Sequence, residues 1–596
     1  MRTSIATVSL SGSLTEKLTA AARAGFDGVE IFENDLLASP LTPEEIRTRC
    51  ADLGLGIDLY QPMRDIEAVP EDEFARNLRR ARHKFELMRR LGTDTVLVCS
   101  SVSPLAADDD ALAAGQLSRL ADLAQDFGIR VAYEALAWGR HVSTYDHAWR
   151  IVETAGHPAL GTCLDSFHIL SRGSDPKDLE GIADIPGEKI FFLQLADAPL
   201  LAMDVLQWSR HYRCFPGQGD FDVAGLVRQV LRTGYDGPLS LEVFNDVFRQ
   251  AEAGPTAVDA QRSLRVLEET VGLTTPPAPV VPTGVAFAEL LTPDAEPVAA
   301  LLGALGFART ARHRSKPVDL WQQGEARLLV NTGPAARRDG TGLAAIGLES
   351  PDPAGAARRA EAMLAPVLPR RRAPRDAPLD AVAAPDGTEL FFCATDHPEL
   401  PSWRADFENT DHRPAATDVT RIDHLALTQP WHHFDEAALF HRSVLGLHAQ
   451  ESVDVADPYG LFRSRAVTNA DGSVRIALAV GPAPAEDEVR AQHIALATAD
   501  VVAAARRFRA AGGRLLPVPA NYYDDLAARH DLPADELATY RDLGILYDRD
   551  AHGVFRHCYT HTVGRVFFEL AQRDGGYRGY GAQNAPVRLA AQHTAR

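Results

Sequence analysis

Short apolar runs alternate with amphipathic helical segments throughout the first 270 residues of the chain. The helical segments, such as residues 13–24, 74–91 and 222–233, place apolar side chains three or four positions apart. The runs predicted as strands are residues 4–9, 28–33, 56–61, 94–99, 130–135, 160–165, 190–195 and 239–244. Eight strand–helix repeats in about 270 residues predict a (β/α)8, or TIM, barrel. A doubly wound open sheet is the alternative, and the absence of a Gly-x-Gly-x-x-Gly motif disfavours it.

A proline-rich stretch ends this pattern and has the composition of a stiff, extended linker. Two weakly similar segments follow it, and each enters a helix that ends near Leu-Gly-Phe (305–307) or Leu-Gly-Leu (445–447). The similarity predicts a duplicated βαβββ unit. We therefore expect four parts: a barrel at residues 1–273, a linker at 274–283, a first module at 284–400 and a second module at 418–596.

Composition narrows the possible partners and the compartment. The formal net charge of −20 disfavours nucleic acid, because binding phosphates requires a basic surface. The six cysteines are scattered without a Cys-x-x-Cys motif, as is typical of a reducing compartment. The first residues run into an apolar strand without a leader signature, and no apolar stretch reaches the roughly 18 residues of a membrane span. We expect a cytoplasmic protein, not bound to membranes, that acts on a small molecule and could form homo-oligomers.

Four polar side chains close the last four predicted barrel strands. Because the functional site of a TIM barrel lies at the carboxyl ends of its strands, these side chains should meet at one mouth. They are Glu134, Asp165, Gln194 and Glu242. Three crowded carboxylates would repel one another unless a cation neutralised them. An all-oxygen ligand set favours Mg²⁺ or Mn²⁺, with Co²⁺ also compatible.

Other polar residues follow the same strand ends. His168 comes three residues after Asp165, and a histidine there is a candidate for catalysis. Arg210, in the loop after the seventh strand, and Arg64, after the third, are candidates for binding a substrate carboxylate. A metal beside a base suits abstraction of a proton next to a ketone. The resulting enolate leads either to an isomerase or epimerase, or to a dehydratase, and spacing alone leaves both open.

A second candidate site lies in the last module. His424, His493 and Glu569 fall on three predicted strands, and two histidines with one carboxylate form the facial triad of non-haem Fe(II) oxygenases. We expect a second divalent ion there, Fe²⁺ or Mg²⁺. The matched positions of the first module, none of which can bind metal, are Phe287, Ala345 and Phe392.

Several motifs resemble the sugar phosphate isomerase/epimerase superfamily, and within it the bacterial 3-dehydroshikimate dehydratases of quinate and shikimate catabolism. The motifs are Tyr-Glu-Ala-Leu-Ala-Trp (133–138), Leu-Asp-Ser-Phe-His (164–168), Gln-Leu-Ala-Asp-Ala-Pro (194–199), Phe-Pro-Gly-Gln-Gly-Asp-Phe-Asp (215–222) and Leu-Glu-Val-Phe-Asn-Asp (241–246). The strands around His424, His493 and Glu569 resemble the vicinal oxygen chelate fold of 4-hydroxyphenylpyruvate dioxygenase. The resemblance thus implies a xylose isomerase-like α/β TIM barrel followed by an α+β vicinal oxygen chelate region.

The resemblance implies a lyase that converts 3-dehydroshikimate to protocatechuate and water in the degradation of aromatic compounds. The metal would hold the C3 ketone while the C4 proton and the C5 hydroxyl leave. Shorter relatives carry a base in a Glu-x-His motif where this chain has Leu136, so we choose His168 as the base.

A less favoured hypothesis is an Fe(II) dioxygenase with the barrel as scaffold. Against it, the Gly-Asn-Phe motif of the dioxygenases is replaced by residues 583–586, which lose the aromatic residue and add Pro586, a helix breaker. We expect the second module to bind metal without turning over 4-hydroxyphenylpyruvate.

Overall fold

The chain forms two compact units, Met1–Thr275 and Pro276–Arg596, and each is described by itself. The computed structural model describes residues 1–173, 176–336, 340–369, 373–374, 376–413, 418–457, 460–480 and 491–594.

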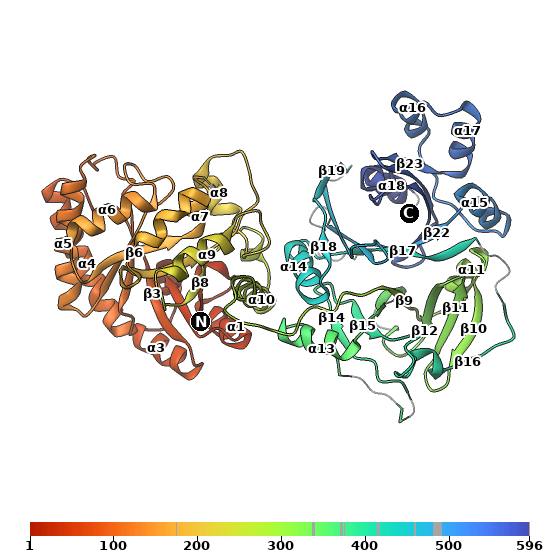
Figure 1. Ribbon diagram of the computed structural model, residues 1–596, viewed down its shortest axis with the longest axis horizontal. Helices are drawn as coiled ribbons and strands as arrows, with labels where there is room; N and C mark the ends of the chain where they lie inside the picture. The colour runs from red at the N-terminus through yellow and green to blue at the C-terminus, as the bar shows by residue number, and fades with distance from the viewer. Residues whose placement is uncertain are drawn as a thin grey trace. The chain divides into compact units, whose positions relative to one another are not determined.

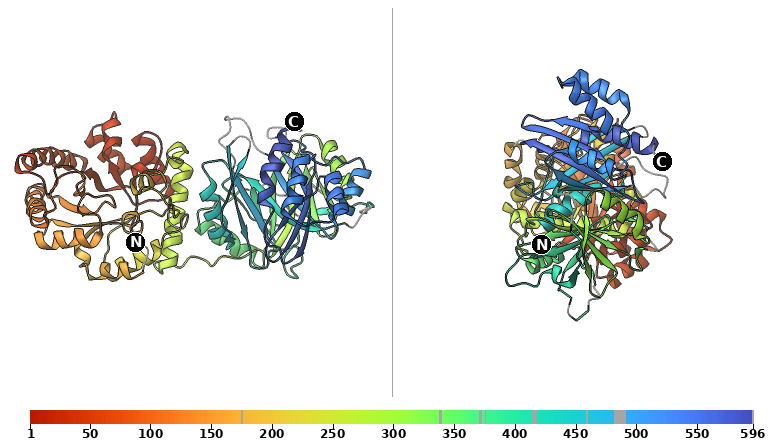
Figure 2. Two further views of the ribbon diagram at one scale, coloured as in Figure 1. Left: turned by 90° about the horizontal axis from the view of Figure 1, so that it is seen from above. Right: turned by 90° about the vertical axis from the view of Figure 1, so that its right-hand side faces the viewer.

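The first unit is a closed barrel of eight parallel strands, as the alternating pattern predicts. The strands are β1 (Thr3–Ala6), β2 (Gly28–Phe32), β3 (Gly56–Met63), β4 (Thr95–Cys99), β5 (Arg130–Glu134), β6 (Leu160–Asp165), β7 (Ile190–Leu195) and β8 (Leu239–Leu241). Figures 1 and 2 show helices surrounding these strands. The strand predicted at residues 239–244 is shorter in the structure, so Glu242 lies just beyond β8.

The barrel helices begin and end at residues with clear capping signals. Ser13 and Glu16 form a capping box at the start of α1, and Gly25 ends it in the left-handed conformation that glycine adopts without strain. The helices are α1 (Leu14–Ala24), α2 (Glu33–Ala38), α3 (Pro43–Asp52), α4 (Glu71–Leu91), α5 (Asp110–Asp126), α6 (Tyr145–Ala155), α7 (Ser166–Leu170), α8 (Val205–His211), α9 (Val223–Arg232) and α10 (Ala253–Val271).

Two apolar layers support the barrel mouth. Helix α4 buries Phe74, Phe85 and Met88 in the layer between helices and strands. A smaller cluster, which includes Leu97 and Cys163, joins side chains of β3 to β7. Because side chains alternate along a strand, Cys163 and Asp165, two residues apart, lie on the same face of β6. The apolar cluster that contains Cys163 therefore lies beneath the Asp165 carboxylate.

The first module of the second unit is a sheet with strand order β14-β15-β13-β9-β12-β11-β10-β16. Helices α11 (Ala295–Ala304) and α13 (Pro353–Ala362) belong to it. Its strands are β9 (Gly284–Leu291), β10 (Ala308–His313), β11 (Val318–Gln323), β12 (Ala326–Asn331), β13 (Gly342–Glu349), β14 (Ala381–Ala383), β15 (Glu389–Cys393) and β16 (Phe407–Asn409).

The second module repeats this arrangement in a sheet with strand order β18-β20-β21-β17-β22-β25-β24-β23, in which β19 pairs with β20. The strands are β17 (Val419–Thr428), β18 (His448–Ala449), β19 (Val453–Asp457), β20 (Gly460–Thr468), β21 (Arg475–Val480), β22 (Gln492–Thr498), β23 (Leu546–Arg549), β24 (Gly553–Tyr559) and β25 (Val566–Gly575). The helices are α14 (Phe434–Leu445), α15 (Val501–Ala510), α16 (Ala520–Arg529), α17 (Ala534–Leu543) and α18 (Ala585–Thr594).

Strand register corrects one matched position of the repeat. In the second module, Ala495 pairs with both His424 and Glu569. In the first module, Gly347 pairs with both Phe287 and Phe391. Phe391, and not the predicted Phe392, is therefore the counterpart of Glu569. The prediction was wrong by one residue, which moves the side chain to the opposite face of the strand.

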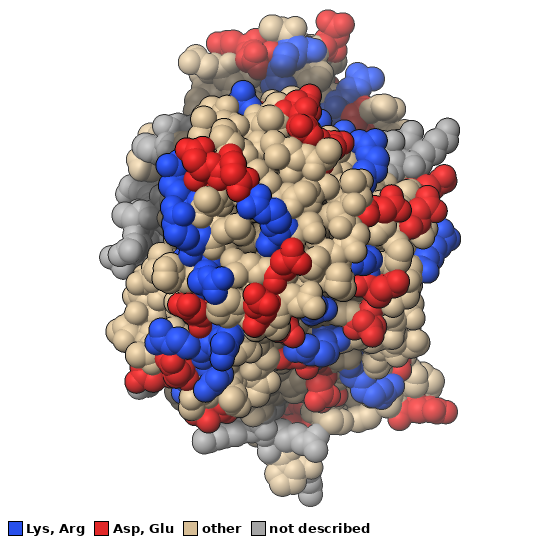
Figure 3. Space-filling view, turned by 90° about the vertical axis from the view of Figure 1, so that its left-hand side faces the viewer, with Lys and Arg blue, Asp and Glu red and all other residues tan. Residues whose placement is uncertain are grey.

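Surface charge is mixed on the side of the barrel unit seen in Figure 3, where acidic and basic side chains are interspersed. Arg90 of α4 pairs with Glu44 of α3, and Arg119 of α5 pairs with Glu71 of α4. Within the described residues, no helix combines the length and apolar character needed to cross a membrane.

Candidate functional site

The four predicted ligands of the barrel gather at its carboxyl-terminal mouth. Glu134 and Asp165 are the last residues of β5 and β6, Gln194 is the penultimate residue of β7, and Glu242 follows β8 directly. All four side chains are buried. Ligand atoms of Glu134, Asp165 and His168 lie within 4.8 Å of one another, so the histidine is also within reach of an ion there.

Glu134 is the side chain that this arrangement leaves least satisfied. Its Oε1 atom is buried and makes no hydrogen bond, while Oε2 accepts only a weak bond from the Cys99 thiol (3.4 Å). Burial and the charges of Asp165 and Glu242 raise the pKa of Glu134 well above its ordinary value. An unpartnered buried carboxylate oxygen beside two further carboxylates fits a divalent cation.

Gln194 is oriented by a buried carboxylate beneath it. Its Nε2 donates to Glu30 (2.6 Å), which also accepts from Gln61 (2.7 Å) and from the Ser240 hydroxyl. Because Glu30 takes the amide N–H, the Gln194 carbonyl oxygen is the atom left for a metal. Glu30 therefore acts as a positioning residue for this ligand.

Arg213 is the basic residue that the structure brings into the site. Its guanidinium is 1% exposed and donates from Nη1 to Asp165 (2.8 Å) and Glu242 (3.1 Å). Ser209 holds the other edge, accepting from Nε and Nη2. The hypothesis that Arg210 binds a substrate carboxylate remains a prediction, but Arg210 is exposed on α8. Sequence spacing does not single out Arg213, which lies just beyond the end of α8 at His211.

Replacing Arg213 with Met should lower the free energy of unfolding of the metal-free barrel by about 3 kcal/mol. The reason is that Asp165 and Glu242 would remain buried without their cation. Urea denaturation of the metal-free protein measures this loss. Arg210→Met is the matched control, because Arg210 is exposed, and an equal loss in both variants would contradict the prediction.

His168 lies against the same guanidinium. The Ala137 N–H donates to Nδ1 (3.2 Å), which leaves Nε2 facing Arg213 Nη2 (3.3 Å) and Asp165 Oδ2 (3.9 Å). Burial lowers the pKa of His168 to about 4, opposed by Asp165 and assisted by Arg213, so the ring is neutral at pH 7. The Ala137 N–H and Arg213 Nη2 are both donors, and a neutral ring can accept on only one of its two nitrogens. The tautomer that accepts from Ala137 on Nδ1 carries its proton on Nε2 and is a proton donor, whereas the tautomer that accepts from Arg213 on Nε2 fits the base of the sequence hypothesis.

Arg64 is exposed on the connection after β3, where its carbonyl oxygen accepts from Arg80. Burial and Glu134 raise the pKa of the Cys99 thiol, and the charge of Arg64 opposes that rise. The hypothesis that Arg64 binds a substrate carboxylate stays a prediction.

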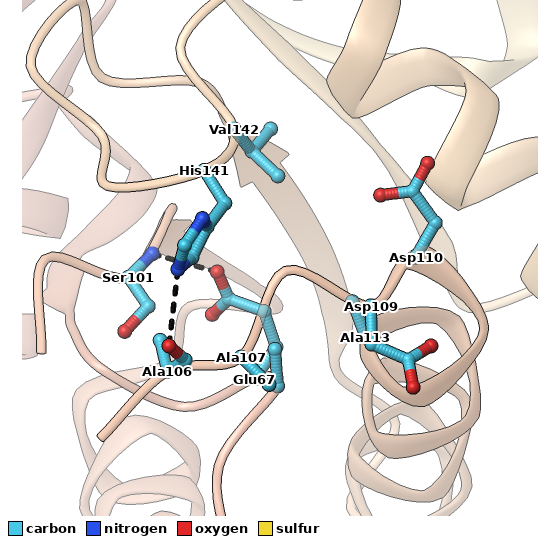
Figure 4. Close-up of a pocket in the computed structure, with 10 residues that line it drawn as sticks. Glu67, Ser101, Ala106, Ala107, Asp109, Asp110, Ala113, His141 and Val142 are labelled. Atoms are coloured by element: carbon cyan, nitrogen blue, oxygen red, sulfur yellow. Dashed lines mark hydrogen bonds between the residues drawn. The ribbon is translucent and has the colours of Figure 1, made fainter. Parts of the chain in front are cut away.

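Glu67 connects the loops beside the barrel mouth through hydrogen bonds. It is buried, and its Oε1 accepts from the Ser101 N–H (2.6 Å) and from the Tyr133 hydroxyl (2.9 Å), next to Glu134. Oε2 has no hydrogen-bond partner and lines a pocket of about 10 Å³, roughly the space of one water. Figure 4 shows the carboxylate in this pocket below His141.

Glu67→Gln should make the barrel more stable than the parent protein at pH 8, but not at pH 4. Burial raises the pKa of Glu67, so the folded state binds this proton more tightly than the unfolded state. Stability from this group is therefore present at low pH and lost as pH rises through the folded pKa. At pH 8 we expect the free energy of unfolding to rise by about 1 kcal/mol and the melting temperature by about 2–4 °C. A stability difference between Glu67→Gln and the parent protein that does not depend on pH would contradict this prediction.

The predicted triad of the second module also comes together. Glu569 Oε2 lies 3.1 Å from His424 Nε2 and 3.0 Å from His493 Nε2, and these two nitrogens are 3.3 Å apart. All three side chains are buried. Although burial opposes it, His424 and His557 hold the pKa of Glu569 well below its ordinary value. The three atoms converge on one point, as ligands of a single ion do.

A second layer of residues, which the sequence did not identify, holds this triad. Asp423 Oδ2 lies 2.8 Å from His424 Nδ1 and is bound by Arg573, so Nε2 is the nitrogen left for a metal. On the other side, His557 Nδ1 lies 2.7 Å from Glu569 Oε1. Asn584 donates to His557 Nε2 (3.0 Å) and thereby ties the carboxylate to the C-terminal segment.

Pro586 begins the C-terminal helix instead of breaking it. It is the second residue of α18, where the missing N–H of proline would be unpaired in any case. The interpretation of Pro586 as a helix breaker was therefore wrong. Helix α18 brings Arg588 over the rings of Tyr559 and Phe567, which pack on His493. The helix thus covers the histidine side of the triad.

Comparisons with known protein families agree with both units. Residues 18–270 match the xylose isomerase-like TIM barrel, residues 277–394 the N-terminal part of hydroxyphenylpyruvate dioxygenase, and residues 421–550 the glyoxalase/bleomycin resistance protein/dioxygenase superfamily. Fold and site therefore define a xylose isomerase-like barrel, with carboxylates at its mouth, fused to a dioxygenase-like vicinal oxygen chelate region.

Full-length relatives identify the family. The chain is 45% identical to a 3-dehydroshikimate dehydratase of Pseudomonas putida and 46% identical to one of Pseudomonas aeruginosa, covering 100% of this chain and 99% of each relative. A solved xylose isomerase-like TIM barrel/4-hydroxyphenylpyruvate dioxygenase fusion protein matches with a TM-score of 0.90 and 44% identity over 100% of both chains. The chain belongs to the 3-dehydroshikimate dehydratase family.

Proposed function

We propose that this protein dehydrates 3-dehydroshikimate to protocatechuate, with the barrel mouth as the active site. The observation that carries the proposal is the convergence of Glu134, Asp165, Gln194 and Glu242 at that mouth, with one Glu134 oxygen left without a partner. The full-length similarity to named dehydratases supports the choice of reaction.

These four residues would hold a divalent cation, for which the oxygen donors favour Mg²⁺ or Mn²⁺, with Co²⁺ as a further candidate. When bound, such a cation supplies Lewis-acid stabilisation of the negative charge that develops on the substrate ketone. Arg213 offsets part of the charge of Asp165 and Glu242 and holds both carboxylates in fixed positions.

The reaction removes the proton of C4, adjacent to the ketone, and the hydroxyl of C5. A further ring proton then leaves carbon while the C3 oxygen gains a proton, which completes the aromatic ring, so the net products are protocatechuate and one water. His168 Nε2 faces the carboxylates, and we assign to the tautomer that accepts from Ala137 on Nδ1, with its proton on Nε2, protonation of the departing C5 hydroxyl. Neutral histidines serve as donors in other enzymes when their surroundings lower the pKa.

The test is an absorbance assay on purified protein with Mg²⁺ or Mn²⁺ and 3-dehydroshikimate. Protocatechuate should accumulate and give its near-ultraviolet absorbance. No absorbance change, with Glu134→Ala indistinguishable from the parent protein, would overturn the proposal. Conversion of a sugar ketone under the same conditions would favour the isomerase or epimerase hypothesis, which uses the same site.

For the second module we propose a divalent ion, Fe²⁺ or Mg²⁺, bound by His424, His493 and Glu569 without oxygenase turnover. The support for the absence of turnover is the loss of the aromatic residue of the Gly-Asn-Phe motif, where this chain has Ala585.

The Fe(II)-loaded protein should form no homogentisate from 4-hydroxyphenylpyruvate under air. Chromatography of the products measures this outcome, with an authentic dioxygenase as the positive control. Binding of Fe²⁺ should still be detected in the parent protein and be lost in His493→Ala. Homogentisate formation by the parent protein would contradict the prediction.

A further inference from the structure

The first module of the second unit, which lacks the metal ligands, contains a partly open cavity of about 100 Å³. Phe287 of β9, Leu329 of β12 and Phe391 of β15 line it. By strand register, Phe287 and Phe391 are the counterparts of His424 and Glu569. The face that holds a metal triad in one module therefore holds an aromatic-lined cavity in the other.

The walls of this cavity are aromatic rings in contact with one another. Between ring centroids, Phe287 lies 4.9 Å from Trp403 and 5.8 Å from Phe391, and Trp403 lies 5.7 Å from Phe407. The Trp403 Nε1–H donates to Thr395 (2.7 Å), so the indole offers no polar atom to a ligand. Ring edges and faces at these distances are the surroundings in which a further aromatic ring packs well.

One end of the cavity is polar. Strand β10 ends at His313, β12 ends at Asn331, and Lys316 lies two residues before the start of β11, so these side chains share one end of the sheet. They line the cavity together with Glu289, whose Oε1 accepts from Asn331 Nδ2 (2.7 Å). The Phe407 ring lies 5.1 Å from the His313 ring, so the hydrogen-bonding groups at this end border the aromatic rings.

This end combines donors and an acceptor. The Ser315 N–H donates to His313 Nδ1 (3.1 Å), and burial with the charge of Lys316 lowers the pKa of His313, so the neutral ring keeps a proton on Nε2. Lys316 has three ammonium donors and is 3.2 Å from Asp376. Donors on Lys316 and His313 beside the Glu289 carboxylate suit a hydroxyl group, which both accepts and donates.

The polar end of the cavity also has the spacing of a metal site, because ligand atoms of His313, Asp376 and Asp406 lie within 4.8 Å of one another. Each carboxylate already has a cation, since Lys316 pairs with Asp376 (3.2 Å) and Arg314 with Asp406 (3.2 Å). Asp406 also accepts from the Ala377 N–H. A divalent ion would have to displace these partners, so an organic ligand fits better.

We propose that this cavity binds one hydroxy-substituted aromatic ring, that is, a monocyclic phenol or catechol. The ring would pack among Phe287, Phe391, Trp403 and Phe407, with its hydroxyl at the polar end. An apolar cavity of about 150 Å³ holds one benzene, so a partly open cavity of about 100 Å³ suits a single ring better than a fused system. The inference stands whether or not the barrel acts on 3-dehydroshikimate, although a product such as protocatechuate belongs to the same class.

The test is fluorine NMR with 4-fluorophenol and the full-length protein, stripped of metal so that neither metal centre binds the probe. The fluorine signal should broaden in a saturable way, and phenol should reverse the broadening while cyclohexanol should not. Fluorobenzene should bind at least tenfold more weakly. Equal binding of fluorobenzene, or no broadening by 4-fluorophenol, would overturn the proposal.

Variants locate the bound probe. Leu329→Phe should fill the cavity and Lys316→Met should remove a donor, each weakening binding at least tenfold. Arg312→Met is the matched control, since Arg312 adjoins His313 but is exposed, and binding should not change. Binding that survives both cavity variants, or that is lost in the barrel variant His168→Asn, would overturn the assignment. Tight Mn²⁺ binding that is lost in His313→Ala would likewise overturn it in favour of a metal.

Discussion

Glu134→Gln should lower the rate of 3-dehydroshikimate dehydration about 10³-fold, because it removes one of three carboxylates that would neutralise the metal. A bound Lewis acid contributes several kcal/mol to transition-state stabilisation, and each 1.36 kcal/mol corresponds to a factor of ten. Glutamine keeps the volume of the side chain, so the buried site should not collapse. The measurements are kcat and the metal content of the purified protein, and both should fall.

The stability of the Glu134→Gln variant distinguishes loss of a metal ligand from loss of the fold. Burial and the charges of Asp165 and Glu242 raise the pKa of Glu134 in the metal-free barrel, so neutral glutamine should leave that form at least as stable as the parent. The matched control is Glu86→Gln on α4, whose side chain is 53% exposed. Retention of full activity and metal content in Glu134→Gln would exclude Glu134 as a ligand.

His168→Asn should lower kcat by about 10²- to 10⁴-fold, the range typical of a lost proton-transfer residue. KM should change little, because asparagine preserves a polar group beside Arg213. The measurement that assigns its role is exchange of the C4 hydrogen of 3-dehydroshikimate with deuterated water.

The two roles of His168 predict opposite exchange results. If Nε2–H protonates the departing hydroxyl, as the Ala137 hydrogen bond to Nδ1 indicates, the variant still exchanges the C4 hydrogen while dehydration stops. If His168 is the base, exchange and dehydration disappear together, and the assignment as proton donor is wrong. His211→Asn is the control, because His211 pairs with exposed Asp246.

Strand patterns in the sequence predicted the barrel and the positions of several polar side chains on its strands. Glu134, Asp165 and Gln194 lie at the strand ends where counting repeats placed them, and His424, His493 and Glu569 lie close together in the second module. The barrel positions follow because a strand end in a closed parallel barrel fixes where a side chain points. The role of these residues as metal ligands stays a prediction.

Other residues could not be found from spacing. Arg213 and Arg210 are three residues apart in one short segment, and only packing decides that Arg213 is buried against Asp165 while Arg210 is exposed. His557 reaches Glu569 because β24 pairs with β25, a contact that local sequence does not reveal. Phe391, and not the predicted Phe392, is the counterpart of Glu569, because sheet register and not sequence similarity aligns the two modules.

The sequence by itself determined the two folds, the ligand types and the chemistry that oxygen and imidazole donors favour, because periodicity and residue type are local properties. Tertiary structure decided which arginine neutralises the carboxylates, which nitrogen of His168 faces them, and that the first module contains a cavity. These depend on distances between segments far apart in the chain. Burial then sets their energies, since a charge or an unpaired oxygen matters most where water is excluded.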